Sequence, residues 1–148
     1  MMSPMGETMT LHVLVLDDDV LVNRTVKRLA PPDVSARCTT SRPRAIELLR
    51  DPSWPCALAL IDVRIGSDRL GGLEVLEVAL AERKDVKCFL VTGSNDVEVK
   101  RRAFDRRVHV LHKPFTKEQL ASIFDEARSL PTPPPRDRLA GRVAWRRA

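Results

Sequence analysis

The sequence lacks long apolar runs, a signal-peptide core and a disulfide pattern. No stretch approaches the roughly 18 consecutive apolar residues that cross a bilayer, and the start, MMSPMGETMT, contains no apolar secretory core. The three cysteines, Cys38, Cys56 and Cys88, stand in apolar surroundings without metal-ligand spacing, so we expect reduced packing residues. Together these absences predict a cytoplasmic protein without a membrane span.

The composition is that of a globular protein. With 148 residues, of which 43% are hydrophobic and 30% charged, the chain can bury the core of one domain and is too short for two full-sized ones. The same balance argues against disorder through most of the length, and it excludes collagen-like, coiled-coil and low-complexity classes.

Positive charge is concentrated at the end of the chain. Residues 131–148 contain five arginines against one acid, Asp137, so this segment carries most of the net charge of +5. We predict a disordered segment at 1–9, a nearly neutral domain at 10–129, and a Pro-rich then Arg-rich tail at 130–148 that begins with the stiff PTPPP stretch. The tail is too short for a folded DNA-binding domain, so a separate output domain is not expected. We expect it to be disordered; a short basic helix that binds a partner, nucleic acid or an anionic membrane is the alternative.

Short apolar runs alternate with segments of helical spacing through the predicted domain. The apolar runs lie at 11–16, 34–38, 56–61, 86–91 and 108–111, and helical patterns follow at 20–29, 43–50, 73–83, 97–104 and 117–128. Buried strands that alternate with helices predict an α/β fold, a doubly wound parallel sheet with helices on both faces.

Polar residues follow these strands at their carboxyl ends, where ligands bind in such folds. They are Asp17, Asp18 and Asp19 after the first run, Asp62 after the third, Thr92 after the fourth and Lys113 after the fifth. Clustered carboxylates repel one another unless a cation lies among them, and their oxygens suit Mg²⁺. A hydroxyl and an ammonium beside that ion would suit a phosphoryl group. Taken singly, each residue also fits a helix cap or a solvated loop.

Four motifs resemble those of response-regulator receiver domains in order and spacing. They are VLVLDDDVLV, ALALIDVRI, FLVTGS and LHKPF, and the resemblance covers nearly all of residues 10–129. It implies a flavodoxin-like (βα)5 fold with strand order 2-1-3-4-5. It also implies a single-domain regulator of a two-component or phosphorelay system, a signalling domain rather than an enzyme.

The resemblance implies a role for each residue that matches a receiver motif. Asp62 would be the phosphoacceptor, Thr92 the hydroxyl that moves to the phosphoryl oxygen, and Lys113 the cation that pairs with the phosphoryl group. The bond between Lys113 and the following proline is commonly cis in the family. The implied partners are a histidine kinase or a histidine phosphotransfer protein as donor, and a downstream protein target. A phosphorylation-dependent homodimer is compatible with the resemblance.

The implied cofactor is Mg²⁺. Asp17 and Asp18 match the acidic pair that holds the metal directly or through water, and Asp62 completes the carboxylates. Arg64 falls where the family offers a backbone carbonyl to the ion. Asp19 also fits a place among these ligands, but we favour a role at the start of the first helix.

Two features depart from the receiver pattern. Most receivers have an aromatic residue three positions before the lysine, where this chain has Val110, so movement of the Thr92 hydroxyl is expected to couple differently to the output face. The stretch after the predicted acceptor, RIGSDRLGGLEV, lacks the usual proline and is longer. Its charged residues Arg64, Asp68 and Arg69 are expected to reach over the pocket.

Two clusters outside these motifs have a plain interpretation beside a functional one. His109 and His112 flank the end of the fifth strand, where packing or exposure is favoured over ligand binding. A group of arginines near the fourth helix fits either a partner surface or a solvated helical face; it consists of Arg101, Arg102, Arg106 and Arg107.

Two functions from other classes remain as alternatives. One is a receiver-like module that binds partners without phosphorylation, which the unusual Val110 keeps open. The other is a haloacid-dehalogenase-like phosphatase, because LDDDVLV loosely matches the opening Asp-x-Asp motif, with Asp17 as nucleophile and Asp19 as acid. After Lys113 the sequence shows no further strand that is followed by an acidic pair, which disfavours the phosphatase.

Overall fold

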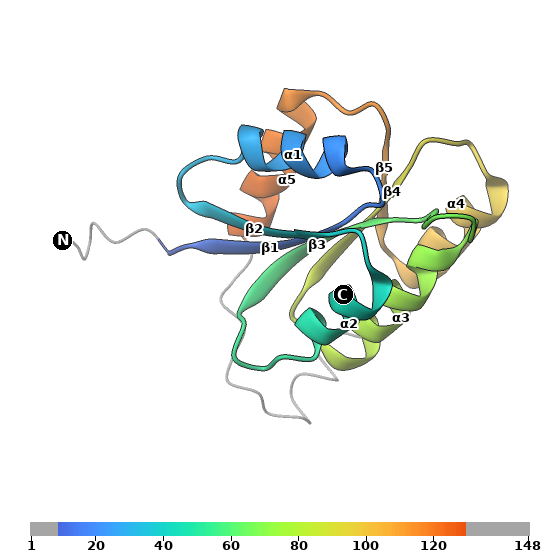
Figure 1. The fold of residues 1–148 in the computed structure, drawn as a ribbon, viewed down its shortest axis with the longest axis horizontal. Helices are drawn as coiled ribbons and strands as arrows, with labels where there is room; N and C mark the ends of the chain where they lie inside the picture. Colours follow the sequence, from blue (N-terminus) through green and yellow to red (C-terminus); the bar gives the residue numbers. More distant parts are fainter. Residues whose placement is uncertain (1–8, 130–148) are drawn as a thin grey trace.

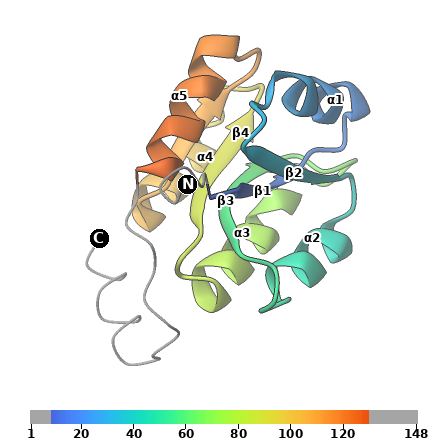
Figure 2. The same ribbon diagram turned by 90° about the vertical axis from the view of Figure 1, so that its left-hand side faces the viewer.

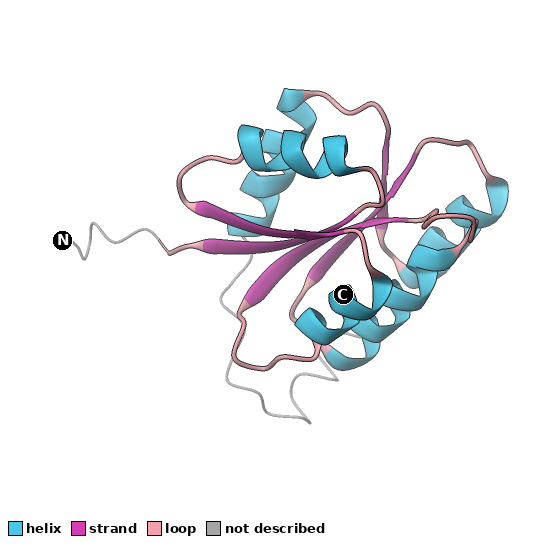
Figure 3. Cartoon of the chain, in the orientation of Figure 1, coloured by secondary structure: helices cyan, strands magenta, loops and turns pink. Residues whose placement is uncertain are grey.

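Strands and helices alternate along the chain in the computed structural model, which describes residues 9–129 (Figure 3). The strands are β1 (Leu11–Leu16), β2 (Val34–Thr39), β3 (Cys56–Asp62), β4 (Lys87–Thr92) and β5 (His109–His112). The helices are α1 (Val20–Leu29), α2 (Arg42–Leu49), α3 (Gly71–Glu82), α4 (Val97–Arg106) and α5 (Lys117–Arg128). Between residues 9 and 129, none of the helices combines the length and the apolar character needed to span a bilayer. The predicted tail at 130–148 and nearly all of the predicted segment at 1–9 lie outside the described residues.

The strands form one parallel sheet in the order β2-β1-β3-β4-β5. This confirms the predicted order and the flavodoxin-like, doubly wound topology. The first two connections run in opposite directions along the sheet, so β1 and β3 are neighbours and Leu16 pairs with Ile61. In such folds a crevice forms beyond the carboxyl ends of the strands at this reversal. The residues that follow β1 and β3 therefore start side by side.

Helices cover both faces of the sheet (Figures 1 and 2). Helices α1 and α5 pack on one face, and α2, α3 and α4 pack on the other, each over its own cluster of buried side chains. Alternate residues of β1 serve the two clusters: Val13 and Val15 belong to the first, Leu14 and Leu16 to the second. Because both sides of the central strands are buried, their sequences are continuous apolar runs rather than alternating ones.

The cysteines lie in or beside these cores and are free thiols. Burial raises the pKa of Cys56 to about 11 and that of Cys88 to about 12. Burial also raises the pKa of the half-buried Cys38. All three therefore remain protonated near neutral pH and act as small packing residues, as predicted.

Polar side chains cap four of the five helices at the carboxyl edge of the sheet. Asp19, Ser41, Asp96 and Thr116 accept hydrogen bonds from backbone N–H groups in the first turns of α1, α2, α4 and α5. These bonds satisfy donors that the helix itself leaves free. They also fix the loops that enter the helices, and most of those loops border the pocket described below.

The boundaries of α3 and α4 differ most from the prediction. We predicted helices at 73–83 and 97–104, whereas α3 begins at Gly71 and α4 extends to Arg106. Two adjacent glycines indicate a loop by local preference, but here they start a helix that lies against the end of β3. The Gly72 N–H donates to the Val63 carbonyl at 2.7 Å. Tertiary contact therefore overrides local propensity at this point.

Helix α4 leaves two large apolar side chains in solvent. Val97 is 77% exposed and Phe104 is 82% exposed, whereas Val99 and Ala103 are buried against the sheet. Residues seven apart lie on the same side of a helix, so Val97 and Phe104 form one outward ridge. Exposed apolar side chains grouped on one side of a helix are typical of surfaces that bind another molecule.

Candidate functional site

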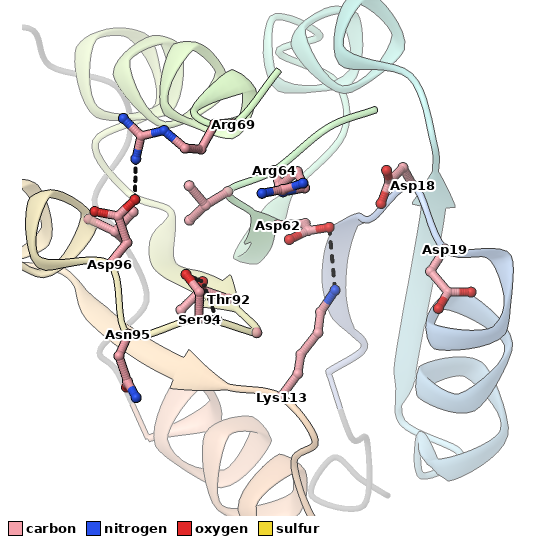
Figure 4. A pocket seen from close by; sticks show the side chains of 13 residues that line it. Asp18, Asp19, Asp62, Arg64, Arg69, Thr92, Ser94, Asn95, Asp96 and Lys113 are labelled. Atoms are coloured by element: carbon pink, nitrogen blue, oxygen red, sulfur yellow. Dashed lines mark hydrogen bonds and ion pairs between the residues drawn. The ribbon is translucent and has the colours of Figure 1, made fainter. Parts of the chain in front are cut away.

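The carboxyl ends of the strands border a pocket of about 690 Å³ (Figure 4). Its polar lining comprises Asp18, Asp19, Asp62, Arg64, Arg69, Thr92, Ser94, Asn95, Asp96 and Lys113. Five of the six residues predicted to converge at this edge line the pocket, and the sixth, Asp17, is buried beside it and bound to Lys113. The structure thus brings together side chains that are far apart in sequence.

Three carboxylates come within metal-binding reach of one another. One oxygen each from Asp17, Asp18 and Asp62 lies within 4.8 Å of the other two. Asp17 Oδ1 accepts the Asp19 N–H at 2.9 Å, and Asp18 Oδ2 accepts the Gly66 N–H at 2.9 Å. Asp62 is the last residue of β3 and is buried. Backbone groups of two loops therefore orient the first two carboxylates, and a strand end positions the third.

Lys113 bridges the two buried carboxylates. Its Nζ lies 2.8 Å from Asp17 Oδ2 and 3.3 Å from Asp62 Oδ2. Its backbone N–H donates to the Thr92 carbonyl at 2.8 Å, which extends the pairing of β4 and β5 by one residue. The Lys113–Pro114 bond is cis, as the resemblance implied. The end of β5 thus directs an ammonium toward the ends of β1 and β3.

The pocket holds more negative charge than Lys113 offsets. Burial, followed by the charge of Asp17, raises the pKa of Asp62 to about 7, and the ammonium of Lys113 counteracts only part of this rise. Burial opposes the charge of Lys113, but the hydrogen bond and charge of Asp17 and the charge of Asp62 outweigh it, so the pKa of Lys113 is raised. A further cation among these carboxylates would therefore be favoured.

The donor set fits Mg²⁺. This ion prefers oxygen ligands and is commonly held by one or two carboxylates together with water. Asp17, Asp18 and Asp62 offer such oxygens within a small volume, and the raised pKa of Asp62 is consistent with a position that gains from positive charge. Arg64 lies beside them in the lining, as a residue offering its backbone carbonyl would require.

The Thr92 hydroxyl is hydrogen-bonded within the loop that follows β4. It ends β4, it is buried, and its Oγ1 accepts the Ser94 N–H at 3.1 Å. The hydroxyl oxygens of Thr92 and Ser94 lie 3.4 Å apart. The sequence analysis did not single out Ser94, although it stands in the same FLVTGS motif two residues after Thr92.

The loop between β3 and α3 borders the pocket, but only part of the prediction for it holds. Arg64 and Arg69 line the pocket, and Arg69 reaches toward α4 from the rim (Figure 4). Asp68 is not in the lining; its Oδ2 lies 3.1 Å from the Arg42 Nη1 of α2. Residues 65–68 form a tight turn that directs Asp68 away from the pocket, so the prediction that it reaches over the site is wrong.

Gly72 allows α3 to approach the end of β3. A Cβ built at this position would lie 1.9 Å from the Asp62 carbonyl oxygen, which no side chain can occupy. At the neighbouring Gly71 the nearest atom to such a Cβ is Ile65 Cβ, at 3.2 Å. Only Gly72 is therefore indispensable for this contact. The sequence shows the glycine pair but cannot tell which of the two faces the backbone of Asp62.

Two further predictions about individual residues can be settled. Asp19 Oδ1 accepts the Leu21 N–H at 2.9 Å, which confirms its favoured role at the start of α1. His109 and His112 are both exposed, and the His109 ring stacks on Phe89 with centroids 5.5 Å apart. Exposure and packing, rather than ligand binding, therefore account for both histidines.

Comparison with solved structures identifies the fold. A CheY-like receiver domain protein from Methanospirillum hungatei JF-1 superposes with a TM-score of 0.70 at 20% identity, covering 80% of this chain and 94% of that one. The non-phosphorylated HemR receiver domain from Leptospira biflexa gives a TM-score of 0.71 at 20% identity and covers 84% and 99%. A receiver protein from Burkholderia phymatum gives 0.69 at 23% identity and covers 84% and 100%. No family model and no curated protein matches the sequence. The described residues therefore have the fold of response-regulator receiver domains.

Proposed function

We propose that this protein is a response regulator that accepts a phosphoryl group on Asp62 in an Mg²⁺-dependent reaction. The donor is a phosphohistidine of a histidine kinase or a histidine phosphotransfer protein. The observation that carries the proposal is the position of the Asp62 carboxylate. It lies among the oxygens of Asp17 and Asp18 and 3.3 Å from Lys113 Nζ, in a pocket beyond the strand ends.

The transfer needs only groups that the pocket supplies. An oxygen of the Asp62 carboxylate attacks the phosphorus, the phosphorus–nitrogen bond of the donor breaks, and its electron pair stays on the imidazole. The product is an acyl phosphate, and no general base is required because Asp62, with Mg²⁺ beside it to favour its ionised form, would react as a carboxylate. Bound Mg²⁺ would neutralise charge on the transferring group. Lys113, whose Nζ lies 3.3 Å from Asp62 Oδ2, would pair with a phosphoryl oxygen on Asp62.

Thr92 is the proposed switch. Its hydroxyl oxygen accepts the Ser94 N–H, and in the proposed switch the side chain turns toward a phosphoryl oxygen on Asp62 and leaves that bond. The added negative charge and acceptor oxygens provide the driving force for that exchange. The loop between β4 and α4 then moves with Thr92, and Val110 on β5 takes the place that a bulkier side chain has in most receivers.

The proposed output surface is the exposed side of α4. Val97 and Phe104 form its apolar ridge, and Arg101 is exposed beside them. Of the predicted arginine cluster, Arg102 and Arg106 bind glutamates of α4 and α3, so these two serve the packing of the domain itself. An apolar ridge next to positive charge suits a protein target with apolar and acidic side chains.

Intact-mass analysis tests the proposal. The protein is incubated with Mg²⁺ and acetyl phosphate beside two variants, Asp62→Asn and Asp68→Asn, of which the second removes an acid outside the pocket. We expect one phosphoryl group on the wild type and on Asp68→Asn, none on Asp62→Asn, and none when Mg²⁺ is chelated. Equal labelling of all three proteins would refute Asp62 as acceptor. No labelling, together with no binding of beryllofluoride, would favour a phosphorylation-independent interaction module.

A further inference from the structure

Arg69 connects two loops across the rim of the pocket. It stands on the loop between β3 and α3, and its guanidinium binds two acids at the start of α4. Figure 4 shows the contact with the first of them, Asp96. One is Asp96, in a direct ion pair, and the other is Glu98, whose Oε1 lies 3.2 Å from Arg69 Nη2. The hydrogen bond from Arg69 is the main reason that the pKa of Glu98 is lowered.

Asp96 has two roles in this contact. Its Oδ1 accepts the Glu98 N–H at 2.9 Å and so caps α4, while its Oδ2 binds Arg69. Glu98 is also shared, because its Oε2 lies 3.0 Å from Arg102 Nη2 one turn further along the helix. Arg69 therefore holds the start of α4 through both residues, rather than binding an isolated surface acid.

The same loop carries the proposed switch. Only three residues separate Thr92 from Asp96, and one of them, Ser94, donates its N–H to Thr92 Oγ1. If Thr92 turns toward Asp62, this bond breaks and the short loop loses one of the contacts that hold its path. One end of that loop is fixed by β4, and Arg69 fixes the other end.

We infer that Arg69 is a positioning residue that stabilises the unphosphorylated arrangement of the β4–α4 loop and thereby opposes the movement of Thr92. This inference rests on the proposed function, because it concerns the response of Thr92 to a group on Asp62. A ligand shifts such an equilibrium only by its different affinity for the two arrangements. Weakening the contacts of Arg69 should therefore make the phosphoryl-bound arrangement easier to reach.

The test uses beryllofluoride, which stands in for the phosphoryl group, titrated in the presence of Mg²⁺. The variants are Arg69→Gln and Asp96→Asn; asparagine still caps a helix, so the second variant leaves α4 intact. We expect both to bind beryllofluoride about two- to fivefold more tightly, the range for loss of exposed ion pairs. Arg69→Lys should fall between Arg69→Gln and the wild type.

The charges of the two variants distinguish loss of the Arg69 contact from a change in the long-range electrostatic attraction of the anion, called a field effect below. Arg69→Gln removes a positive charge and Asp96→Asn a negative one, so a field effect on an anion would shift their affinities in opposite directions. Loss of the contact shifts both in the same direction. The matched control is Arg50→Gln, which breaks a similarly exposed ion pair with Glu82 between α2 and α3. We expect it to bind beryllofluoride as the wild type does.

Salt gives a second readout, because exposed ion pairs are screened. The advantage of Arg69→Gln over the wild type should shrink at about 1 M salt, where the Debye length is about 3 Å. If the wild type binds beryllofluoride and Arg69→Gln binds it equally or more weakly, the inference is overturned while the proposed function stands. If the wild type does not bind it at all, both are overturned.

Discussion

Lys113 places its Nζ 3.3 Å from Asp62 Oδ2, although β4 lies between the strands that carry the two residues. The same nitrogen lies 2.8 Å from Asp17 Oδ2. One partly buried ammonium therefore serves two buried carboxylates, whose mutual repulsion it offsets only in part. Removal of the cation and removal of one carboxylate should consequently change the stability of the metal-free protein in opposite directions.

Replacement of Lys113 by methionine should destabilise the metal-free protein. Asp17 and Asp62 would lose their shared cation and remain buried, and loss of one partner of a buried pair is strongly unfavourable. Because the Lys113 side chain is 23% exposed, we expect a loss of roughly 1–3 kcal/mol in the free energy of unfolding. Urea denaturation in the presence of a chelator measures it. The control Lys100→Met, at an exposed position of α4, should change little, and equal losses in the two variants would contradict the argument.

Replacement of Asp62 by asparagine should stabilise the metal-free protein above pH 7. The pKa of Asp62 rises on folding from its ordinary value of 3.8 to about 7, so the native state binds this proton more tightly than the unfolded state. The stability of the wild type therefore falls as the pH rises between these two values, and the penalty is complete above them. Asparagine carries no charge, so the variant does not lose stability in this way. We expect a gain of roughly 1–3 kcal/mol at pH 8.

The pH dependence of that gain is the decisive measurement. Urea denaturation of both proteins in chelator should show that the difference in free energy of unfolding shrinks as the pH falls from 8 toward 4. At the lower pH the Asp62 carboxyl of the folded wild type is protonated and, like asparagine, carries no charge. Asp68→Asn, in the exposed turn beside the pocket, should show no comparable trend. A gain for Asp62→Asn that is the same at pH 4 and pH 8 would show that ionisation is not its cause.

Much of this architecture could be predicted from the sequence because strong local signals agree with the fold. Buried parallel strands are continuous apolar runs, so the sheet order and the convergence of Asp17, Asp62 and Lys113 follow from the pattern and the family resemblance. Contacts between loops leave no such signal. Arg69 bound to α4 and Asp68 bound to α2 depend on the path of the loop, and charged residues in a loop indicate only exposure.

Gly72 provides a separate test of how β3 and α3 are joined. Alanine there would place its Cβ 1.9 Å from the Asp62 carbonyl oxygen, and backbone cannot yield as the end of a flexible side chain can. We expect Gly72→Ala to lose about 3 kcal/mol or more of stability. Gly71→Ala, whose closest contact is 3.2 Å, should lose far less and should still be phosphorylated. Thermal unfolding and labelling by acetyl phosphate measure both; a similar loss in the two variants would disprove the proposed close approach.

Arg83 should be needed for stability and not for the chemistry of the pocket. It is buried at the end of α3, and its guanidinium donates to the carbonyls of Leu49 at 3.0 Å, Asp51 at 3.2 Å and Trp54 at 3.0 Å. These groups lie at the amino ends of the strands, opposite the pocket. Methionine would fill much of the space but leave the three carbonyls without a donor. Buried acceptors that lose their donor cost more free energy than a hydrogen bond whose two partners are both removed.

We expect Arg83→Met to lose roughly 2–4 kcal/mol in the free energy of unfolding, as for other buried networks that lose one member. At a temperature where the variant is still folded, Asp62 should be labelled by acetyl phosphate at the wild-type rate. Arg50→Met, which removes an exposed arginine from the neighbouring α2–α3 ion pair, is the matched control and should lose less than about 1 kcal/mol. A folded Arg83→Met protein with impaired labelling would mean that the two ends of the sheet are coupled.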